Sequence, residues 1–175
     1  MLGPVLAGSR VRGALVHAHL EWVRDCFGES VAARVIGALL ARVAREVAAT
    51  PPDGWCSFES LIQLDRTIAQ VCGLGRDGIY RELGHHTARA DAISRGGTFA
   101  RTDIHRYLRC SAVRDTHFLD RAVCRYDEVS PTGGRLAILE AGSSSAVYCA
   151  SLAGYYQQVI TLHGAEAVEV TESAC

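Results

Sequence analysis

The last thirty residues, from Ala146-Val-Tyr-Cys-Ala-Ser-Leu-Ala-Gly-Tyr155 to Val168-Glu-Val-Thr-Glu-Ser-Ala-Cys175, contain the pattern that decides the fold. The first part has the apolar content of a helix that continues to Ile160, and residues 167–171 have the character of a strand. We therefore expect the chain to end in a helix and a strand that are joined by a turn. Three residues of types that bind metals lie at this junction: Cys149, Glu172 and Cys175.

A hairpin is predicted directly upstream of this helix. Residues 121–129 and 135–139 alternate between apolar and polar side chains, and Ser130-Pro-Thr-Gly-Gly134 between them is a loop signal. Ser143-Ser-Ser145 then supplies a cap for the final helix. Strands that follow a run of helices are typical of an α+β domain. We predict one domain of residues 1–175, with N-terminal helices packed over a small antiparallel sheet and a C-terminal helix and strand.

Five helices are predicted ahead of the hairpin from apolar residues at helical spacing: 11–27, 30–48, 57–72, 78–94 and a short one from 104 onward. Ser57 is a residue type that caps helices, and either Thr102 or Asp103 can cap the short helix. The helix over 30–48 has a wide apolar arc, so we expect it to be largely buried and bent near Gly37.

The composition is that of an ordinary globular domain. The 175 residues are 49% hydrophobic and 21% charged, which is far from the disordered class. A net charge of −1 argues against a broad surface for nucleic acid or anionic membranes. The sequence has no Lys, which excludes Schiff-base chemistry. No apolar run approaches the ~20 residues that span a bilayer.

The seven cysteines are odd in number and scattered, which favours reduced thiols over a disulfide framework. Four of them lie in or near apolar stripes and are expected to be buried: Cys26, Cys56, Cys72 and Cys110. No signal peptide is evident ahead of the first helix. We therefore expect a cytoplasmic protein without a membrane span.

The C-terminal third resembles the 4-vinyl-reductase-type domain and the N-terminal sensor domain of aromatic-responsive activators of the XylR and DmpR type. The resemblance rests on Cys149, the Gly154-Tyr155 step, Glu172 and Cys175, in that order and spacing. In that family these positions hold a structural zinc ion. The resemblance therefore implies that Cys149, Glu172 and Cys175 bind zinc, with a fourth ligand beyond Cys175.

The N-terminal half resembles haem-nitric-oxide-binding domains and a bacterial family related to them. Val11-Arg-Gly-Ala-Leu15, Trp22-Val-Arg-Asp-Cys-Phe-Gly28 and Trp55-Cys-Ser-Phe58 carry this resemblance. With the TRAPP vesicle-tethering subunits, these proteins share an arrangement of helices over a small sheet. His105 resembles the haem-ligating histidine of the nitric-oxide sensors. Those sensors hold the haem propionates with a Tyr-x-Ser-x-Arg motif, whose Tyr and Arg are both missing from residues 140–145 here. We therefore expect no haem and a partly exposed His105.

Chemistry permits zinc at the C-terminus but does not require it. Thiolate and carboxylate ligands suit tetrahedral zinc, and a local turn could point Glu172 and Cys175 at one ion. Cys149 joins them only if its helix packs against the last strand. In the alternative, Cys149 is a small buried hydrophobe and Glu172 a surface charge. His17 and His19 are two residues apart and His85 and His86 are adjacent, so the members of each pair cannot lie on the same face of a helix. We assign no role to these four histidines.

No phosphate loop, nucleophile elbow or zinc-protease helix is present, so we expect no enzyme. The stretch from Thr116 to Val123 is similar to the segment that carries the pocket histidine in the 4-vinyl-reductase-type family. We expect a regulatory module that binds a small, mostly apolar ligand and signals through a homodimer or a partner protein. The pocket candidates are His117, Phe118, Trp55, Tyr107 and Tyr155. Two alternatives stay open, an assembly module with a closed core and a haem-based gas sensor.

Overall fold

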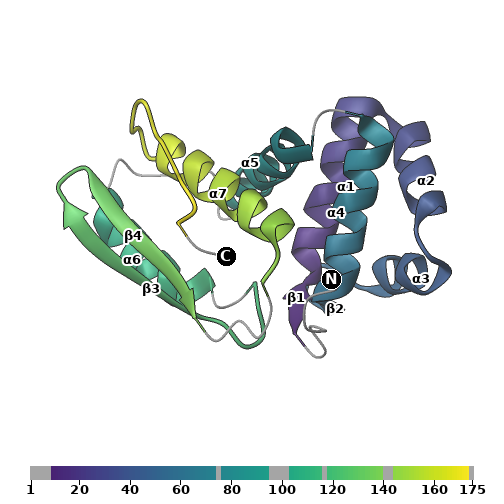
Figure 1. Ribbon diagram of the computed structural model, residues 1–175, viewed down its shortest axis with the longest axis horizontal. Coiled ribbons are helices and arrows are strands. Elements are labelled where there is room, and N and C mark those ends of the chain that lie inside the picture. Colours follow the sequence, from purple (N-terminus) through teal and green to yellow (C-terminus); the bar gives the residue numbers. More distant parts are fainter. Residues whose placement is uncertain (1–8, 74–75, 95–102, 116–117, 140–143, 174–175) are drawn as a thin grey trace.

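The computed structural model describes residues 9–73, 76–94, 103–115, 118–139 and 144–173 (Figure 1). Within these residues the chain forms seven helices and two antiparallel sheets of two strands each, which confirms the α+β prediction. In chain order the elements are β1 (Arg10–Arg12), α1 (Gly13–Phe27), α2 (Glu29–Ala38), α3 (Ala41–Ala49), β2 (Trp55–Ser57), α4 (Phe58–Cys72), α5 (Arg76–Ser94), α6 (Ile104–Asp115), β3 (Val123–Ser130), β4 (Gly133–Leu139) and α7 (Ala146–Leu162). No helix in these ranges is long and apolar enough to cross a membrane.

The helices and strands lie in groups beside one another across the molecule, and α7 returns to its middle (Figure 1). α1 and α4 lie side by side, with α2 and α3 on their outer side. α5 packs closely against α7, and this pair lies between the N-terminal helices and the hairpin of β3 and β4. α6 covers one face of the hairpin. The hairpin has the predicted position, with Val123 opposite Leu139 and a register shift near its turn.

A small sheet that the sequence pattern did not predict sets α1 beside α4. β1 pairs with β2, with Arg10 opposite Ser57 and Arg12 opposite Trp55. α1 and α4 start directly after these strands and run in the same direction (Figure 1). The predicted cap of α4 is present, because the Ser57 hydroxyl accepts a hydrogen bond from the backbone N–H of Ser60.

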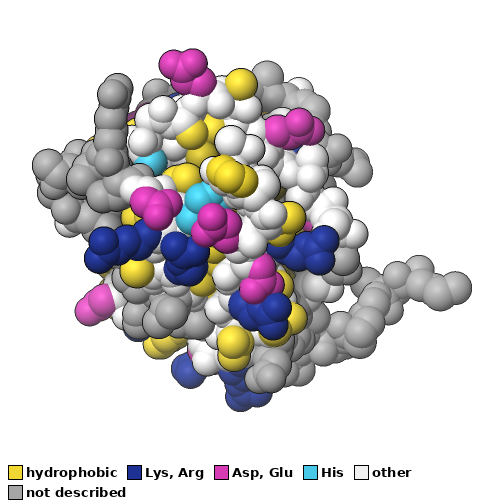
Figure 2. All heavy atoms as spheres, turned by 90° about the vertical axis from the view of Figure 1, so that its left-hand side faces the viewer, with side chains coloured by type: hydrophobic (Ala, Val, Ile, Leu, Met, Phe, Trp, Pro, Cys, Tyr) yellow, Lys and Arg dark blue, Asp and Glu magenta, His cyan; other side chains and the backbone are white. Residues whose placement is uncertain are grey.

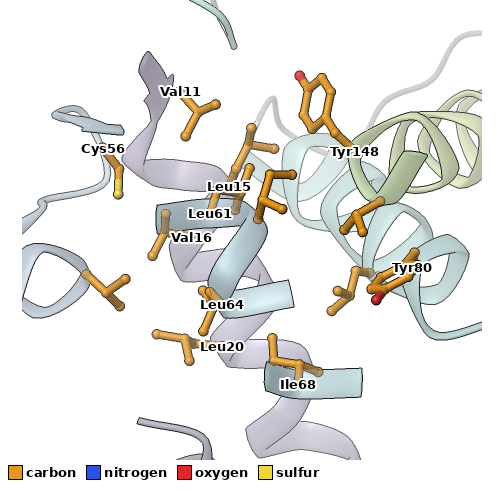
Figure 3. Close-up of a cluster of buried hydrophobic side chains, with 14 of the residues drawn as sticks. Val11, Leu15, Val16, Leu20, Cys56, Leu61, Leu64, Ile68, Tyr80 and Tyr148 are labelled. Atoms are coloured by element: carbon orange, nitrogen blue, oxygen red, sulfur yellow. The ribbon is translucent and has the colours of Figure 1, made fainter. Parts of the chain in front are cut away.

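Apolar side chains fill the space between α1 and α4 (Figure 3). The buried residues of this interface that Figure 3 labels are Leu15, Val16, Leu20, Leu61, Leu64 and Ile68, with Tyr80 of α5 and Tyr148 of α7 beside them. One polar pair lies within this region. The Nδ1 atom of His19 is 2.7 Å from Oδ1 of Asp65, and the two side chains are only 1% and 0% exposed. A buried ion pair or hydrogen bond of this kind tolerates little displacement of either helix.

The predicted helix over residues 30–48 is two helices in the structure. Leu39 and Leu40 adopt extended backbone conformations between α2 and α3, two residues after the predicted bend at Gly37. The prediction that this region is largely buried was wrong. α2 buries Ala32 and Val35, and α3 buries only Val43 and Val47. Both helices lie on the outside of the bundle, where one apolar stripe faces α4 and the remaining surface faces solvent.

The predicted final strand over residues 167–171 does not form. Side chains bind its backbone in place of a partner strand. The Gln157 side-chain amide donates a hydrogen bond to the carbonyl of Val168, and the Arg81 guanidinium donates to the carbonyl of Val170. The tail is therefore held against α5 and α7 by side-chain hydrogen bonds. The alternating side chains of this segment favour a strand, but a strand also needs a neighbouring strand to pair with. Neither described sheet has a strand beside this segment.

Two glycines allow α5 and α7 to approach closely. A Cβ atom at Gly84 would lie 1.9 Å from the carbonyl oxygen of Ser151, and one at Gly154 would lie 2.2 Å from the carbonyl oxygen of Arg81. Both distances are far inside van der Waals contact, and both neighbours are backbone atoms. The Gly154-Tyr155 step is therefore required for the packing of these two helices.

We predict that Gly154→Ala lowers the free energy of unfolding by at least about 2 kcal/mol, because the added methyl group forces the two helix backbones apart. Gly37→Ala is the matched control, since Gly37 is exposed in α2 and has open space around it. This second change is expected to be neutral or to stabilise by up to ~1 kcal/mol. Urea unfolding of both variants measures the difference, and equal effects would contradict the close contact.

The buried pair generates a second prediction. Asp65→Ala leaves the His19 ring without its partner and is expected to cost about 3–5 kcal/mol. The double variant His19→Leu/Asp65→Ala should cost less than the sum of the two single changes, by about 1–3 kcal/mol. Urea unfolding of the four proteins in a double-mutant cycle gives this coupling energy. Strict additivity would show that the two side chains do not interact.

Candidate functional site

Aromatic side chains gather where α7, α6 and the hairpin meet. This group, the aromatic cluster, consists of Tyr107, Phe118, Tyr126, Tyr155 and Tyr156. The ring centroids of Phe118 and Tyr155 are 5.7 Å apart and those of Tyr155 and Tyr156 are 5.3 Å apart, both in edge-to-face geometry. Edge-to-face pairs at these distances are favourable beyond the area that they bury. The cluster is therefore a second apolar core beside the one around α1 and α4.

Phe118 connects the two cores. Its side chain packs against both of them. Its carbonyl accepts a hydrogen bond from the backbone N–H of Arg12 in β1, at 3.0 Å. Asp120 continues this pairing, because its backbone N–H donates to the carbonyl of Arg10. The segment after α6 thus attaches the aromatic cluster to the N-terminal sheet.

Polar groups lie at the edges of the aromatic cluster. The hydroxyl of Tyr155 donates to Oδ2 of Asp91 on α5, at 2.9 Å. The ring of Tyr107 lies 4.0 Å from that of His163, whose Nδ1 donates to the carbonyl of Val159. This arrangement of apolar rings with a few fixed polar groups resembles the lining of small-molecule sites.

His105 is buried, which corrects the expectation of a partly exposed residue. It belongs to the first turn of α6, is 7% exposed, and its ring contacts the hairpin. Its Nε2 is 2.9 Å from the carbonyl oxygen of Pro131 and its Nδ1 is 2.7 Å from the hydroxyl of Tyr126. A carbonyl only accepts, so Nε2 carries the proton and the Nδ1 of a neutral ring accepts from Tyr126. Burial, together with the charge of Glu128, raises the pKa of Tyr126, which keeps this hydroxyl protonated. Both ring nitrogens are therefore engaged within the protein.

The structure brings three of the five predicted pocket residues together. Phe118, Tyr107 and Tyr155 all belong to the aromatic cluster or pack into it. Trp55 lies on β2, where its ring faces the guanidinium carbons of Arg10 and Arg12 at 5.6 Å and 4.1 Å from the ring centroid. These are cation–π contacts at a surface. His117 lies outside the described residues, and ligand binding by all five remains a prediction.

The predicted zinc ligands are only partly placed. Cys149 is half-buried on α7, Glu172 is exposed in the tail, and Cys175 lies outside the described residues. Among the residues that the structure describes, no group of three or more His, Cys, Asp or Glu side chains is arranged to hold a metal ion. The zinc site therefore remains a prediction that gains no support here.

The predicted burial of the cysteines is correct for one of the four. Cys56 is fully buried, whereas Cys72 is half-buried and Cys26 and Cys110 are exposed. Cys26 lies in the last turn of α1 and Cys110 on α6, and both side chains are accessible to solvent. An apolar stripe does not show where a helix leaves the core.

The buried pair of His19 and Asp65 was not predicted from the sequence. His19 falls on the apolar stripe of Leu15, Val16 and Trp22, and Asp65 lies between Leu64 and Ile68. A polar residue inside each of two apolar stripes was the available signal. Nε2 of His19 and Oδ2 of Asp65 are buried and have no hydrogen-bond partner among the residues that the structure describes. The pair is therefore only half satisfied by the described residues.

Comparisons with known proteins identify the fold. No family model and no curated protein matches the chain. Two solved structures of an Fe(II) unliganded H-NOX protein from K. algicida are similar. A point mutant of that protein aligns with a TM-score of 0.62 at 13% identity, and the unmodified protein with 0.61 at 12% identity. Each alignment covers 86% of this chain and 82% of the other. The specific resemblance to 4-vinyl-reductase-type domains is not confirmed, whereas the chain has the fold of H-NOX proteins.

Proposed function

We propose that this chain is a non-enzymatic regulatory module that binds a small, mostly apolar molecule at the aromatic cluster. The observation that carries the proposal is the position of Phe118. Its ring packs on Tyr155 in the aromatic cluster, and its backbone is bonded to β1 of the N-terminal sheet. A ligand that displaced this ring would act on both halves of the molecule.

The polar edge of the cluster supports recognition of a ligand with one polar group. Tyr155 and Asp91 form a hydrogen bond between α7 and α5, beside the glycines that hold those helices together. A bound hydroxyl or amine could replace either partner of this bond. Signalling then needs only that the ligand binds one packing of α5 against α7 better than another. The output through a homodimer or a partner protein is part of the same proposal.

The surroundings of His105, the candidate haem ligand, do not suit haem binding. The similar solved structures are described as Fe(II) unliganded H-NOX proteins. An axial ligand requires a free imidazole nitrogen, and both nitrogens of His105 are engaged with Tyr126 and Pro131. Ligation would break one of these buried hydrogen bonds. We therefore place haem-based gas sensing below the apolar-ligand proposal.

An assembly module with a closed core is the second candidate. Tyr155 and Tyr156 are 3% and 7% exposed, so the centre of the aromatic cluster is closed to solvent. The outer face of the hairpin also exposes apolar residues, with Val129 at 73% and the facing pair Val123 and Leu139 at nearly half. Figure 2, which views this side, shows hydrophobic side chains among charges of both signs. Such a mixed surface is typical of protein contacts that are not permanent.

The first test uses toluene and p-cresol, which differ by one hydroxyl group. Each should raise the thermal midpoint of the native chain, by roughly 5–10 °C if its concentration reaches 100 times its dissociation constant. Tyr155→Phe keeps the ring but loses the hydrogen bond to Asp91. It should therefore weaken the binding of p-cresol more than the binding of toluene. Thr67→Val is the control outside the aromatic cluster, because it removes a hydroxyl that donates within α4 to the carbonyl of Gln63, and it should change the binding of neither probe. No shift with either probe would favour the closed assembly module.

The second test is a titration with hemin. We expect no saturable Soret band that depends on His105, because that ring is held by Tyr126 and Pro131. The variants His105→Ala and His17→Ala separate specific from adventitious binding, since His17 lies on α1 and bonds the Thr50 carbonyl. A one-to-one Soret band that His105→Ala abolishes and His17→Ala retains would establish the gas-sensor alternative.

A further inference from the structure

The contact between His19 and Asp65 defines which residues of α1 and α4 face each other. Both helices have fifteen residues, begin beside the same small sheet and run in the same direction (Figure 1). His19 and Asp65 touch at 2.7 Å near the middle of this interface. Seven residues along a helix return to within about 20° of the same face. The next facing pair toward the helix ends is therefore seven residues further on in each helix.

These positions are Cys26 and Cys72. Cys26 lies seven residues after His19, and Cys72 lies seven residues after Asp65. Both belong to the last turn of their helices, where α1 and α4 end beside each other. Two thiols at facing positions of adjacent helix ends are placed for reaction with each other, and helix ends adjust their backbone more readily than helix centres.

Accessibility and electrostatics agree with this placement. Cys26 is exposed and Cys72 half-buried, so an oxidant in solution can reach them, whereas Cys56 is fully buried. Burial is the main cause that raises the pKa of Cys72, and the nearby Cys26 adds to it while Arg34 opposes it. This contribution of Cys26 to the pKa of Cys72 agrees with neighbouring positions of the two residues at the helix ends.

We propose that Cys26 and Cys72 are a reversible redox pair that hydrogen peroxide, or a peroxide of that class, converts into an intramolecular disulfide. One thiolate attacks a peroxide oxygen, which forms a sulfenic acid and releases hydroxide. The second thiolate attacks the sulfenic sulfur, forms the S–S bond and displaces a second hydroxide. The two thiol protons convert both hydroxides to water, so two thiols and one peroxide give one disulfide and two waters. A dithiol reverses the reaction.

The disulfide would join the ends of α1 and α4 around the chain that contains α2, α3 and β2. α5 begins at Arg76, four residues after Cys72, and α5 packs against α7 beside the aromatic cluster. Oxidation thus stiffens the attachment of the helix that carries Asp91. Cys26 and Cys72 lie outside the aromatic cluster, and their oxidation does not depend on whether that cluster binds a ligand.

The local charges predict a slow reaction at neutral pH that accelerates as the pH rises. Burial, Asp25 and Glu82 raise the pKa of Cys26, and Arg89 opposes them only in part. For Cys72 the pKa is raised by burial and by Cys26, against Arg34. The nucleophile is the thiolate, so the rate should increase across the range above the ordinary thiol pKa. This profile distinguishes a reacting pair from a purely structural one.

The experiment treats the reduced full chain with hydrogen peroxide and follows thiols and mass. We expect the loss of two thiols and of the mass of two hydrogen atoms, with peptide mapping that joins Cys26 to Cys72. Dithiothreitol should restore both thiols. The oxidised chain should melt at least roughly 5 °C higher than the reduced chain.

Variants make the assignment specific. Cys26→Ser and Cys72→Ser should each abolish the cross-link and the rise in thermal midpoint. Cys110→Ser, at another exposed cysteine, should retain both. Cys56 should stay reduced in every case, because burial raises the pKa of Cys56 to about 11. A disulfide that joins two chains, or sulfinic acid at Cys26 with Cys72 still reduced, would overturn the proposal.

Discussion

The hydrogen-bonded pair of His19 and Asp65 is the contact on which the N-terminal half depends. Both side chains lie in an apolar interface, where a polar group without a partner costs about 1–3 kcal/mol. A shift of α1 against α4 by one residue would separate the pair and leave both groups unbonded. Apolar side chains such as Leu61 and Leu64 allow several neighbouring registers at small cost. The polar pair therefore selects one register, and with it the facing positions of Cys26 and Cys72.

Two other contacts connect this half to the rest of the chain. Gly84 and Gly154 let α5 and α7 approach so closely that either helix must follow a movement of the other. Phe118 bonds to β1 through its backbone and packs into the aromatic cluster through its ring. Ligand binding at the aromatic cluster and oxidation at the ends of α1 and α4 would thus act on the same helix, α5, from opposite sides.

Hydrophobic period and turn chemistry predicted most elements but not their partners. The hairpin around Ser130-Pro-Thr-Gly-Gly134 and the cap at Ser57 formed as expected, because both depend on residues close in the sequence. The prediction of a single helix over 30–48 was wrong at Leu39 and Leu40, where the backbone is extended. Leucine is a good helix former, so these two residues gave no sign of the break. The strand over 167–171 failed because a strand needs an edge to pair with, and Gln157 and Arg81 bind that backbone instead.

The sequence by itself determined the α+β class, the position of the hairpin and of most helices, and the ends of the helices that precede Gly28 and Gly73. These features follow from the spacing of apolar residues and from glycines that adopt unusual backbone conformations. Both effects depend on neighbouring residues in the sequence and not on tertiary contacts. Only the tertiary structure decided that His105 is engaged on both ring nitrogens, that His19 meets Asp65, and that Phe118 joins two cores. Each of these contacts joins residues far apart in the chain, and their meeting is set by how whole helices pack, which leaves no local pattern in the sequence.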